Sequence, residues 1–278
     1  MGNGMADLGR VVASLALSTF ILQLFPRCSA FLFPTEGRGI SAHRHRPFPS
    51  SNAAAALSAT AYSSARSYDL VVIGGGSAGL TAAKFAATFG FKAVIVERAK
   101  LGGDCTWTGC VPSKSLIASG KAANLARKAG EYGIIVGGGG TVKVDMKAVR
   151  ERLRENMRRI YEEDDSPEAM AKLGIDTIEG SAHFVSPSAV IVSPSGVGGD
   201  SGAIEVTARE GIVIATGAKP RMPSIEGLDT VDYMTYEGVF DLDEVPDRMT
   251  VVGGGPIGCE LAQVFGRLGS TVTVVADR

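Results

Sequence analysis

The feature that most constrains the fold of this chain is a glycine-rich turn that directly follows an apolar segment. Residues 68–73 (YDLVVI) predict a buried strand, and the next six residues read GGGSAG. A helical stretch at 80–89 follows, and then an apolar strand at 93–96 that ends at Glu97. The order of strand, G-x-G-x-x-G, helix, strand and acid is typical of a dinucleotide-binding unit.

Each residue of this unit has a physical task. Gly74 permits the tight turn, Gly76 lets a pyrophosphate approach the backbone, and Gly79 lets the helix pack closely on the strand. The free N–H groups at the start of the helix favour an anion there. Glu97 can accept hydrogen bonds from the hydroxyls of an adenosine ribose. We therefore predict that these four residues bind a dinucleotide.

The same unit returns 179 residues later along the chain. Gly253, Gly255 and Gly258 repeat the spacing of the first turn, between a predicted strand and a predicted helix. Two dinucleotide units in one chain imply two dinucleotides, between which electrons pass. We expect a tightly held flavin, FAD, and a diffusible nicotinamide.

The second unit differs from the first at the position that reads the ribose. Ala276 stands where the first unit has Glu97, which leaves room for a 2′-phosphate. Arg278 could bind that phosphate, and this favours NADPH. Asp277 could instead accept a hydrogen bond from a 2′-hydroxyl, so NADH stays open as the alternative.

Residues 101–114 (LGGDCTWTGCVPSK) hold two cysteines just after the first unit. Cys105 and Cys110 are five residues apart, close enough to bridge on a helical turn. The other two cysteines, Cys28 and Cys259, are too few to complete a Cys₄ zinc site, and no histidine stands at ligand spacing, so we predict no metal site. Neighbouring Gly and Lys residues favour reactive thiols over a pair of inert buried ones.

The run GGDCTWTGCVPSK, in which Gly103 precedes the first cysteine by two residues, resembles the class I flavoprotein pyridine nucleotide–disulfide oxidoreductases. Dihydrolipoamide dehydrogenase, glutathione reductase and mercuric reductase belong to that family. Residues 214–220 (IATGAKP), which include Thr216 and Gly217, are similar to its second flavin-contacting stretch. The resemblance covers residues 68–278.

The resemblance implies a role for four residues. Cys105 would be the interchange thiol that meets the substrate, and Cys110 would lie against the flavin ring as a charge-transfer thiolate. Lys114 would approach the flavin and pair with Glu260, which stands at the start of the second dinucleotide helix. Electrons would then pass from NAD(P)H through FAD to a Cys105–Cys110 disulfide, and on to a small-molecule disulfide, dithiol or metal-ion substrate.

Several residues depart from the usual pattern of the family. Asp104 and the run Thr106-Trp107-Thr108 look like the mercuric-reductase-like branch. Pro256 stands where glutathione reductases place a tyrosine, which argues against that activity, and no metal-binding G-M-T-C-x-x-C module is present. The leading hypothesis is a mercuric-reductase-like oxidoreductase. A plastid dihydrolipoamide dehydrogenase and a non-catalytic flavin-binding fragment of a truncated gene model are the alternatives.

The first 66 residues have a different composition and carry a net charge of +4, against −5 for the rest. Residues 11–25 form an apolar run that is shorter than the roughly 20 residues of a membrane span, so they predict a signal peptide at 1–30. Residues 31–66 are rich in Ser, Ala, Pro and Arg, which is typical of a transit peptide. We predict a bipartite plastid presequence and no stable membrane association after processing. A plain secretory signal is the alternative.

The remaining chain predicts an α/β protein. A Rossmann-like FAD-binding domain would occupy residues 67–247, with a β-meander insertion made of strands near 177–179, 189–192 and 204–207. The start of a second Rossmann-like, NAD(P)-binding domain would follow at 248–278. The balance of 28 basic and 29 acidic residues argues against a nucleic-acid partner.

Members of the resembling family are longer than this chain. On the resemblance, a C-terminal interface domain would supply a His–Glu acid–base pair from the partner subunit of a homodimer. We therefore expect the full-length form to be a homodimer and this chain alone to be poorly active.

Overall fold

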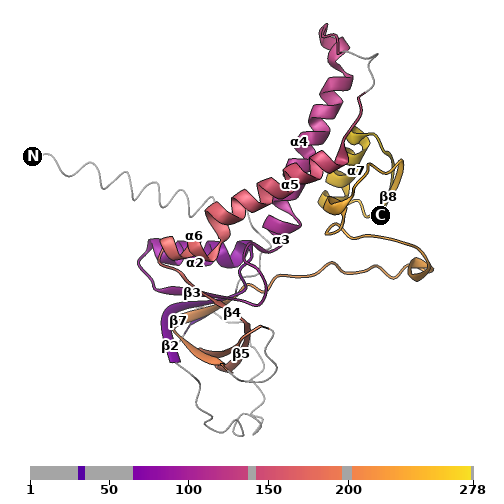
Figure 1. Ribbon diagram of the computed structural model, residues 1–278. Coiled ribbons are helices and arrows are strands. Elements are labelled where there is room, and N and C mark those ends of the chain that lie inside the picture. Colours follow the sequence, from indigo (N-terminus) through magenta and orange to yellow (C-terminus); the bar gives the residue numbers. More distant parts are fainter. Residues whose placement is uncertain (1–30, 35–64, 137–141, 196–201, 277–278) are drawn as a thin grey trace, which may run out of the picture.

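The computed structural model describes residues 31–34, 65–136, 142–195 and 202–276 (Figure 1). The predicted signal peptide, most of the predicted transit peptide and Arg278 lie outside these residues. The strands are β1 (Phe31–Pro34), β2 (Ala65–Ile73), β3 (Ala93–Glu97), β4 (Asp176–Glu179), β5 (Ser181–Ser186), β6 (Ala189–Ser193), β7 (Ile204–Ile214), β8 (Arg248–Val252) and β9 (Thr271–Val275). The α-helices are α2 (Ser77–Thr88), α3 (Gly103–Trp107), α4 (Cys110–Arg127), α5 (Met146–Ile160), α6 (Pro167–Lys172) and α7 (Pro256–Leu268).

The larger sheet has the strand order β4-β3-β2-β7-β6-β5, and the backbone of β1 pairs antiparallel with the end of β7. Strands β4, β3, β2 and β7 run parallel to one another, whereas β6 pairs antiparallel with both β7 and β5. The chain passes from β2 to β3 on one side, and β7 lies on the other side of β2. Ligands of such sheets bind at a switch point of this kind, at the carboxyl ends of the strands.

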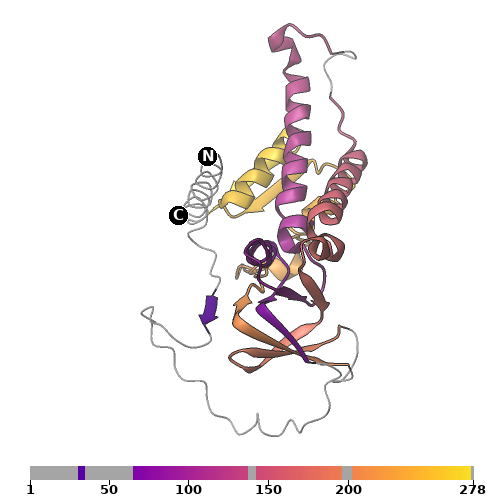
Figure 2. The ribbon, with the colours of Figure 1, turned by 90° about the vertical axis from the view of Figure 1, so that its left-hand side faces the viewer.

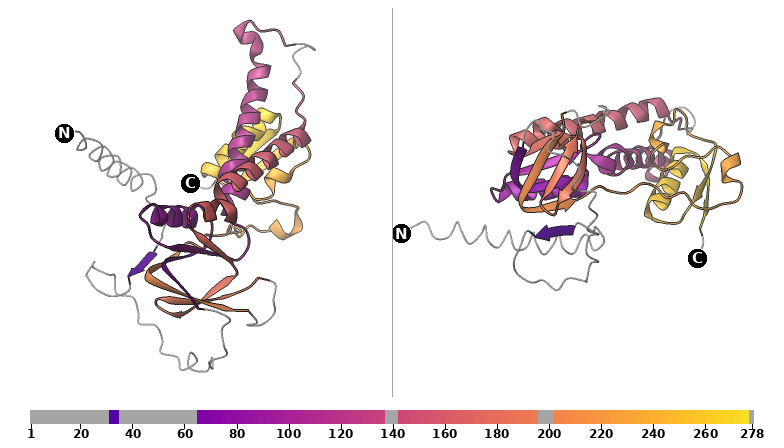
Figure 3. Two further views of the ribbon diagram at one scale, coloured as in Figure 1. Left: turned by 60° about the vertical axis from the view of Figure 1, so that its left-hand side comes forward. Right: turned by 90° about the horizontal axis from the view of Figure 1, so that it is seen from below.

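The two faces of the parallel strands are covered by different layers. Helices α2 and α6 pack on one face, where their apolar side chains share a core with β2 and β3 (Figure 3). Strand β6 and the first part of β7, with which it pairs antiparallel, curve over the other face and form a second core with it. Strand β3 is buried on both faces, which explains the continuous apolar run AVIV that precedes Glu97.

A third core lies away from the large sheet, between helices α4, α5 and α7. Figure 2 shows α4 between the other two helices. Buried residues from all three contribute, among them Leu116, Leu153 and Phe265. Gly120 of α4 approaches α7 so closely that an added Cβ would lie 2.7 Å from Cγ2 of Val264. This packing joins the second glycine-rich unit, which consists of β8, α7 and β9, to the helix that begins at Cys110.

The predicted meander was wrong in part. The segment near 177–179 is β4, which pairs parallel with β3 and belongs to the Rossmann-like sheet. The meander begins with β5 instead, which the sequence did not reveal because its side chains are mostly exposed and lack an apolar alternation. Strand β7 extends to Ile214, beyond the segment predicted near 204–207, since exposed Arg209 and Glu210 interrupt the apolar pattern while the backbone pairing resumes after them.

Within the ranges described above, no helix is long and apolar enough to cross a membrane.

Candidate functional site

The first glycine-rich turn has the geometry that close backbone contacts demand. Gly74 has φ +104°, and a Cβ there would lie 2.3 Å from the carbonyl oxygen of Ala215. A Cβ on Gly79 would lie 1.8 Å from the carbonyl oxygen of Gly74. Helix α2 begins after Gly76 with no side-chain cap and no acid in its first turn. Its free N–H groups therefore form a site for an anion.

The other predicted flavin contacts meet at this turn. Gly103 touches it, because a Cβ there would lie 2.7 Å from Cα of Gly76. The carboxylate of Glu97, at the end of β3, accepts hydrogen bonds from the backbone N–H groups of Gly75 (2.7 Å) and Ala99 (2.9 Å).

Thr216 and Gly217 follow the end of β7. They are held next to β2 because the N–H of Ala215 donates to the carbonyl of Ile73 over 2.8 Å. Apart from Lys114, seven residues are predicted to contact the flavin. The structure brings all seven to the carboxyl ends of three neighbouring strands.

The second glycine-rich turn repeats the first. Gly253 has φ +115°, a Cβ on Gly258 would lie 2.2 Å from the carbonyl oxygen of Gly253, and Gly255 precedes α7 without a side-chain cap. A Cβ on Gly254 would lie 3.1 Å from Cβ of Ala276, just as one on Gly75 would lie 3.3 Å from Cβ of Glu97. Ala276 therefore occupies the place of the ribose-reading acid.

The two cysteines lie on different helices, not on one helical turn as the spacing suggested. Cys105 is in α3 and Cys110 begins α4, because Thr108 and Gly109 interrupt the helix. A side chain at Gly109 would not fit, since its Cβ would lie 2.7 Å from the carbonyl oxygen of Asp104. Both cysteines are free thiols in the structure.

The two thiols nevertheless interact and have different surroundings. Cys105 is partly buried, whereas Cys110 is exposed. Burial raises the pKa of Cys105 from 9.0 to about 11, and its contact with the Cys110 thiol adds to the shift. A hydrogen bond with Ser77 opposes it. Cys105 is therefore protonated at neutral pH.

The partly buried thiol, Cys105, lines a cavity. A cavity of about 310 Å³ lies between α2, α3 and the end of α5, and Cys105 lines it whereas Cys110 does not. Its lining residues are Ser77, Leu80, Thr81, Lys84, Gly102, Cys105, Thr106, Val111, Ile160, Asp164 and Asp165. The sequence analysis missed Lys84 and Asp165. Lys84 could have been found from its spacing of seven residues after Ser77, which places both on one face of a helix.

Lys114 and Glu260 form the pair that the resemblance implied. The ammonium nitrogen Nζ lies 3.1 Å from Oε1 and 3.0 Å from Oε2 of the carboxylate. Lys114 is one turn after Cys110 on α4, and Glu260 is in the first half of α7. The pair therefore links the helix of one redox thiol to the second dinucleotide-binding turn.

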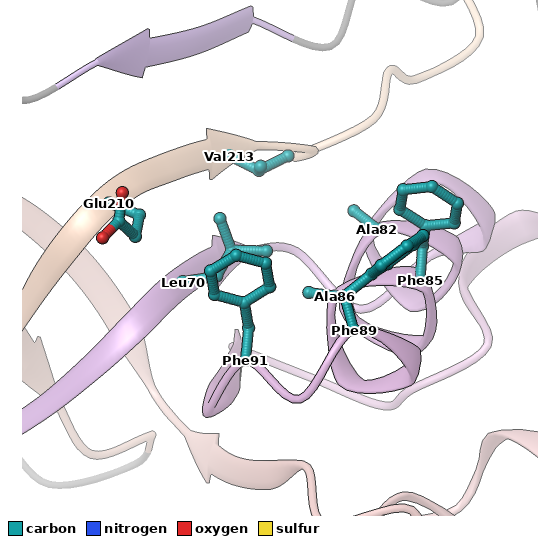
Figure 4. A pocket seen from close by; sticks show the side chains of 8 residues that line it. All are labelled: Leu70, Ala82, Phe85, Ala86, Phe89, Phe91, Glu210 and Val213. Atoms are coloured by element: carbon teal, nitrogen blue, oxygen red, sulfur yellow. The ribbon is translucent and has the colours of Figure 1, made fainter.

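A second cavity, of about 230 Å³, lies on the other side of α2 (Figure 4). Its lining is apolar except for Glu210: Leu70, Ala82, Phe85, Ala86, Phe89, Phe91, Glu210 and Val213. None of these lining residues is a cysteine. Among the residues with described positions, no cluster of three or more His, Cys, Asp or Glu side chains could hold a metal ion.

Comparison with known proteins agrees with this geometry. Residues 68–278 match the family described as pyridine nucleotide-disulphide oxidoreductase. A mercuric reductase of Lysinibacillus sphaericus is 34% identical over 75% of this chain and 36% of its own length. A dihydrolipoyl dehydrogenase of Bacillus subtilis (strain 168) is 34% identical over 77% of this chain and 45% of its own length. A glutathione reductase of Yarrowia lipolytica is 35% identical over 74% of this chain and 43% of its own length.

A solved structure shares the fold. It is an HOCl-induced flavoprotein disulfide reductase of Escherichia coli in a Cu(II) complex, with 26% identity and a TM-score of 0.58 over 75% of this chain and 42% of that one. The chain spans less than half the length of each of these relatives. The match over residues 68–278, together with the paired glycine turns and the thiol pair, shows that the chain belongs to the pyridine nucleotide–disulfide oxidoreductase family.

Proposed function

We propose that the full-length protein is an NAD(P)H-dependent flavoprotein in which Cys105 and Cys110 are the redox-active pair. The asymmetry of the two thiols carries the proposal. Cys105 lines the cavity, whereas Cys110 begins the helix whose Lys114 pairs with Glu260 of the second dinucleotide unit. This arrangement suits electron entry at Cys110 and electron exit at Cys105.

The residues of the first turn fit FAD. The uncapped start of α2 offers N–H groups to a pyrophosphate, and no Cβ fills the space at Gly76. We infer that Gly74, Gly76, Gly79, Glu97, Gly103, Thr216 and Gly217 hold it, with Lys114 beside its ring. When bound, FAD would supply the two-electron relay between the nicotinamide and the disulfide.

The second turn fits a pyridine nucleotide in the same way. Gly253, Gly255 and Gly258 leave the start of α7 free for a pyrophosphate. The absence of a carboxylate at Ala276 supports NADPH, and Arg278 would contact the 2′-phosphate. Comparing kcat/KM for NADPH and NADH, in the parent and in Arg278→Gln, tests this choice. A loss confined to NADPH is the expected result.

The described thiols supply the substrate chemistry. With a disulfide substrate, the Cys105 thiolate would attack one sulfur of the substrate, form a mixed disulfide and release the first thiol once that sulfur gains a proton; oxidation of a dithiol such as dihydrolipoamide would pass through the same mixed disulfide in the reverse direction. The Cys110 thiolate would then attack the sulfur of Cys105, restore the Cys105–Cys110 disulfide and release the second thiol. Two electrons thereby move from the pair to the substrate. We propose that a His–Glu pair of the partner subunit in a homodimer carries the protons.

Titration of the purified full-length protein with NADPH tests the assignment of the thiols. A long-wavelength charge-transfer band should appear, because the proposed thiolate of Cys110 lies against the oxidised flavin ring. Cys110→Ser should abolish the band, and the matched variant Cys105→Ser should retain it. A band that persists in Cys110→Ser would refute the role of Cys110.

The proposed substrate follows from the residues that depart from the family pattern, and the proposed compartment follows from the composition of residues 1–66. We propose a mercuric-reductase-like activity, with dihydrolipoamide oxidation as the alternative. Assays with mercuric ion, dihydrolipoamide and oxidised glutathione separate these activities, and turnover of oxidised glutathione alone would contradict both. For the compartment we propose the plastid, which a fluorescent fusion of residues 1–66 would test; secretion of the fusion would indicate a plain signal peptide.

A further inference from the structure

The helix that carries Cys105 is too short to hold its own position. Helix α3 spans five residues, and isolated helices below about 12 residues are marginal in water. Its position therefore depends on contacts with its neighbours. Two of these contacts lead to one element, the π-helical turn Tyr161–Asp165 at the end of α5. Such turns are rare in proteins, and those that occur are often at functional sites.

The first contact is a buried hydrogen bond. Oγ1 of Thr106 donates to Oδ2 of Asp165 over 2.6 Å, and the two residues are only 3% and 8% exposed. A carboxylate acceptor makes this bond stronger than one between neutral groups. Asp165 also faces Nζ of Lys84 on α2 at 3.7 Å. One buried carboxylate thus connects the residue next to Cys105 with both α2 and the π-helical turn.

The second contact is between two aromatic rings tilted by 54°. The ring of Trp107 lies 5.1 Å from that of Tyr161, centroid to centroid. The ammonium of Lys100 lies 3.5 Å from the Trp107 centroid and 4.4 Å from the Tyr161 centroid, which is a cation–π arrangement. The indole N–H of Trp107 also donates to the carbonyl of Leu101 over 2.8 Å. Two consecutive residues of α3 are therefore anchored to the same turn.

We propose that the turn Tyr161–Asp165 positions Cys105, and that Thr106 and Asp165 are the positioning residues that keep its thiol partly buried at the cavity. The sequence departures at Thr106 and Trp107 then have a structural purpose, since both side chains reach this turn. This positioning role rests on the proposed function only because we take the position of Cys105 to serve disulfide exchange. The position itself can be measured without turnover.

The surroundings of the thiol define the expected effect. Burial is the largest cause of the raised pKa of Cys105, so a loosened α3 hydrates the thiol, lowers its pKa and increases the thiolate fraction. The charged groups around the same cavity are Lys84 on α2, and Asp164 and Asp165 on the turn. Since the thiolate is the nucleophile, the rate of alkylation reports this change directly.

The experiment uses the full-length protein with Cys28, Cys110 and Cys259 replaced by Ser, so that iodoacetamide reports on Cys105 alone. Thr106→Val should raise the alkylation rate constant at neutral pH by about tenfold, which corresponds to a pKa lower by about one unit. Thr106→Ser keeps the hydroxyl and should restore the parent profile. If only the volume of the side chain at position 106 mattered, Thr106→Ser would not restore the alkylation rate of the parent.

Thr108→Val is the matched control. It makes the same change two residues later, at a buried Oγ1 that has no hydrogen-bond partner in the described part of the chain. Its alkylation profile should equal that of the parent. If Thr106→Val gives the same profile as Thr108→Val, the proposal is wrong.

A second variant covers the case in which Thr106→Val does not fold. Asp165→Asn keeps an oxygen acceptor but loses the charge, so it should increase the alkylation rate by less than Thr106→Val would, and no increase overturns the proposal. The two proposals fail differently. Turnover is measured on the same substitutions in the full-length protein with its own cysteines, because Cys110→Ser removes a proposed redox thiol. Unchanged alkylation rates beside an active reductase contradict the positioning role alone, whereas altered alkylation rates beside a loss of NADPH-dependent turnover in the parent contradict the proposed function alone.

Discussion

Lys114 and Glu260 join the two dinucleotide-binding units through an ion pair in which one ammonium contacts both carboxylate oxygens, at 3.1 and 3.0 Å. The residues are 146 positions apart in sequence, and they meet because α4 packs against α7 through Gly120 and Val264. The side chains are 62% and 43% exposed. An ion pair with that exposure contributes little to stability, so its importance is in orientation.

Glu260→Gln should therefore separate stability from function. We expect the free energy of unfolding to change by no more than about 1 kcal/mol. In the full-length protein the rate of flavin reduction by NADPH should fall, because Lys114 loses the charge that orients it. Stopped-flow absorbance and urea denaturation measure the two quantities. Glu151→Gln, in the exposed pair between Arg154 and Glu151, is the control and should leave flavin reduction unchanged.

Alanine substitutions of glycines should have opposite signs at different positions of the glycine-rich units. Gly79→Ala places a Cβ 1.8 Å from a backbone oxygen, and we expect it to destabilise the fold by about 1–3 kcal/mol or more. Gly266→Ala, in α7, meets nothing within 4 Å and should stabilise the chain by about 0.5–1 kcal/mol. Thermal unfolding of both variants measures the difference. Equal effects would contradict the close packing of Gly79 on Gly74.

The raised pKa of Cys105 predicts how stability depends on pH. The fold favours the protonated thiol, so the unfolded state loses its proton first as the pH rises. The contribution is complete below the ordinary value of 9.0 and is lost as the pH rises towards about 11. Urea denaturation at a series of alkaline pH values should show the decline, and Cys105→Ser should make it shallower. An identical slope in that variant would contradict the burial of the thiol.

Arg127 should stabilise the second unit from outside it. Its guanidinium donates to the carbonyl oxygens of Arg267 and Leu268, at the C-terminal end of α7, where helix carbonyls lack partners. Arg127→Ala should cost about 1–2 kcal/mol and increase hydrogen exchange in α7 more than in β2. The neighbouring substitution Lys128→Ala should leave exchange in α7 as it is in the parent.

Local patterns predicted most of the elements near the site. The strands predicted at 68–73 and 93–96 coincide with most of β2 and β3, and the two glycine turns repeat in space as they do in sequence. Such turns are readable because only glycine tolerates their backbone angles and contacts. The meander was misread where it lacks an apolar alternation. Strand β5 is mostly exposed, and two charged residues in β7 interrupt a strand that the backbone continues.

By itself the sequence determined which residues carry the chemistry: two glycine turns for anions, two thiols, and a lysine and a glutamate matched to a family. These are properties of single residues and short spacings. Only the tertiary structure decided that Cys105 lines a cavity, and that Thr106 reaches Asp165 across 59 positions. The physical reason is that burial and long-range hydrogen bonds arise where separate helices pack, and no local pattern records which helices will meet.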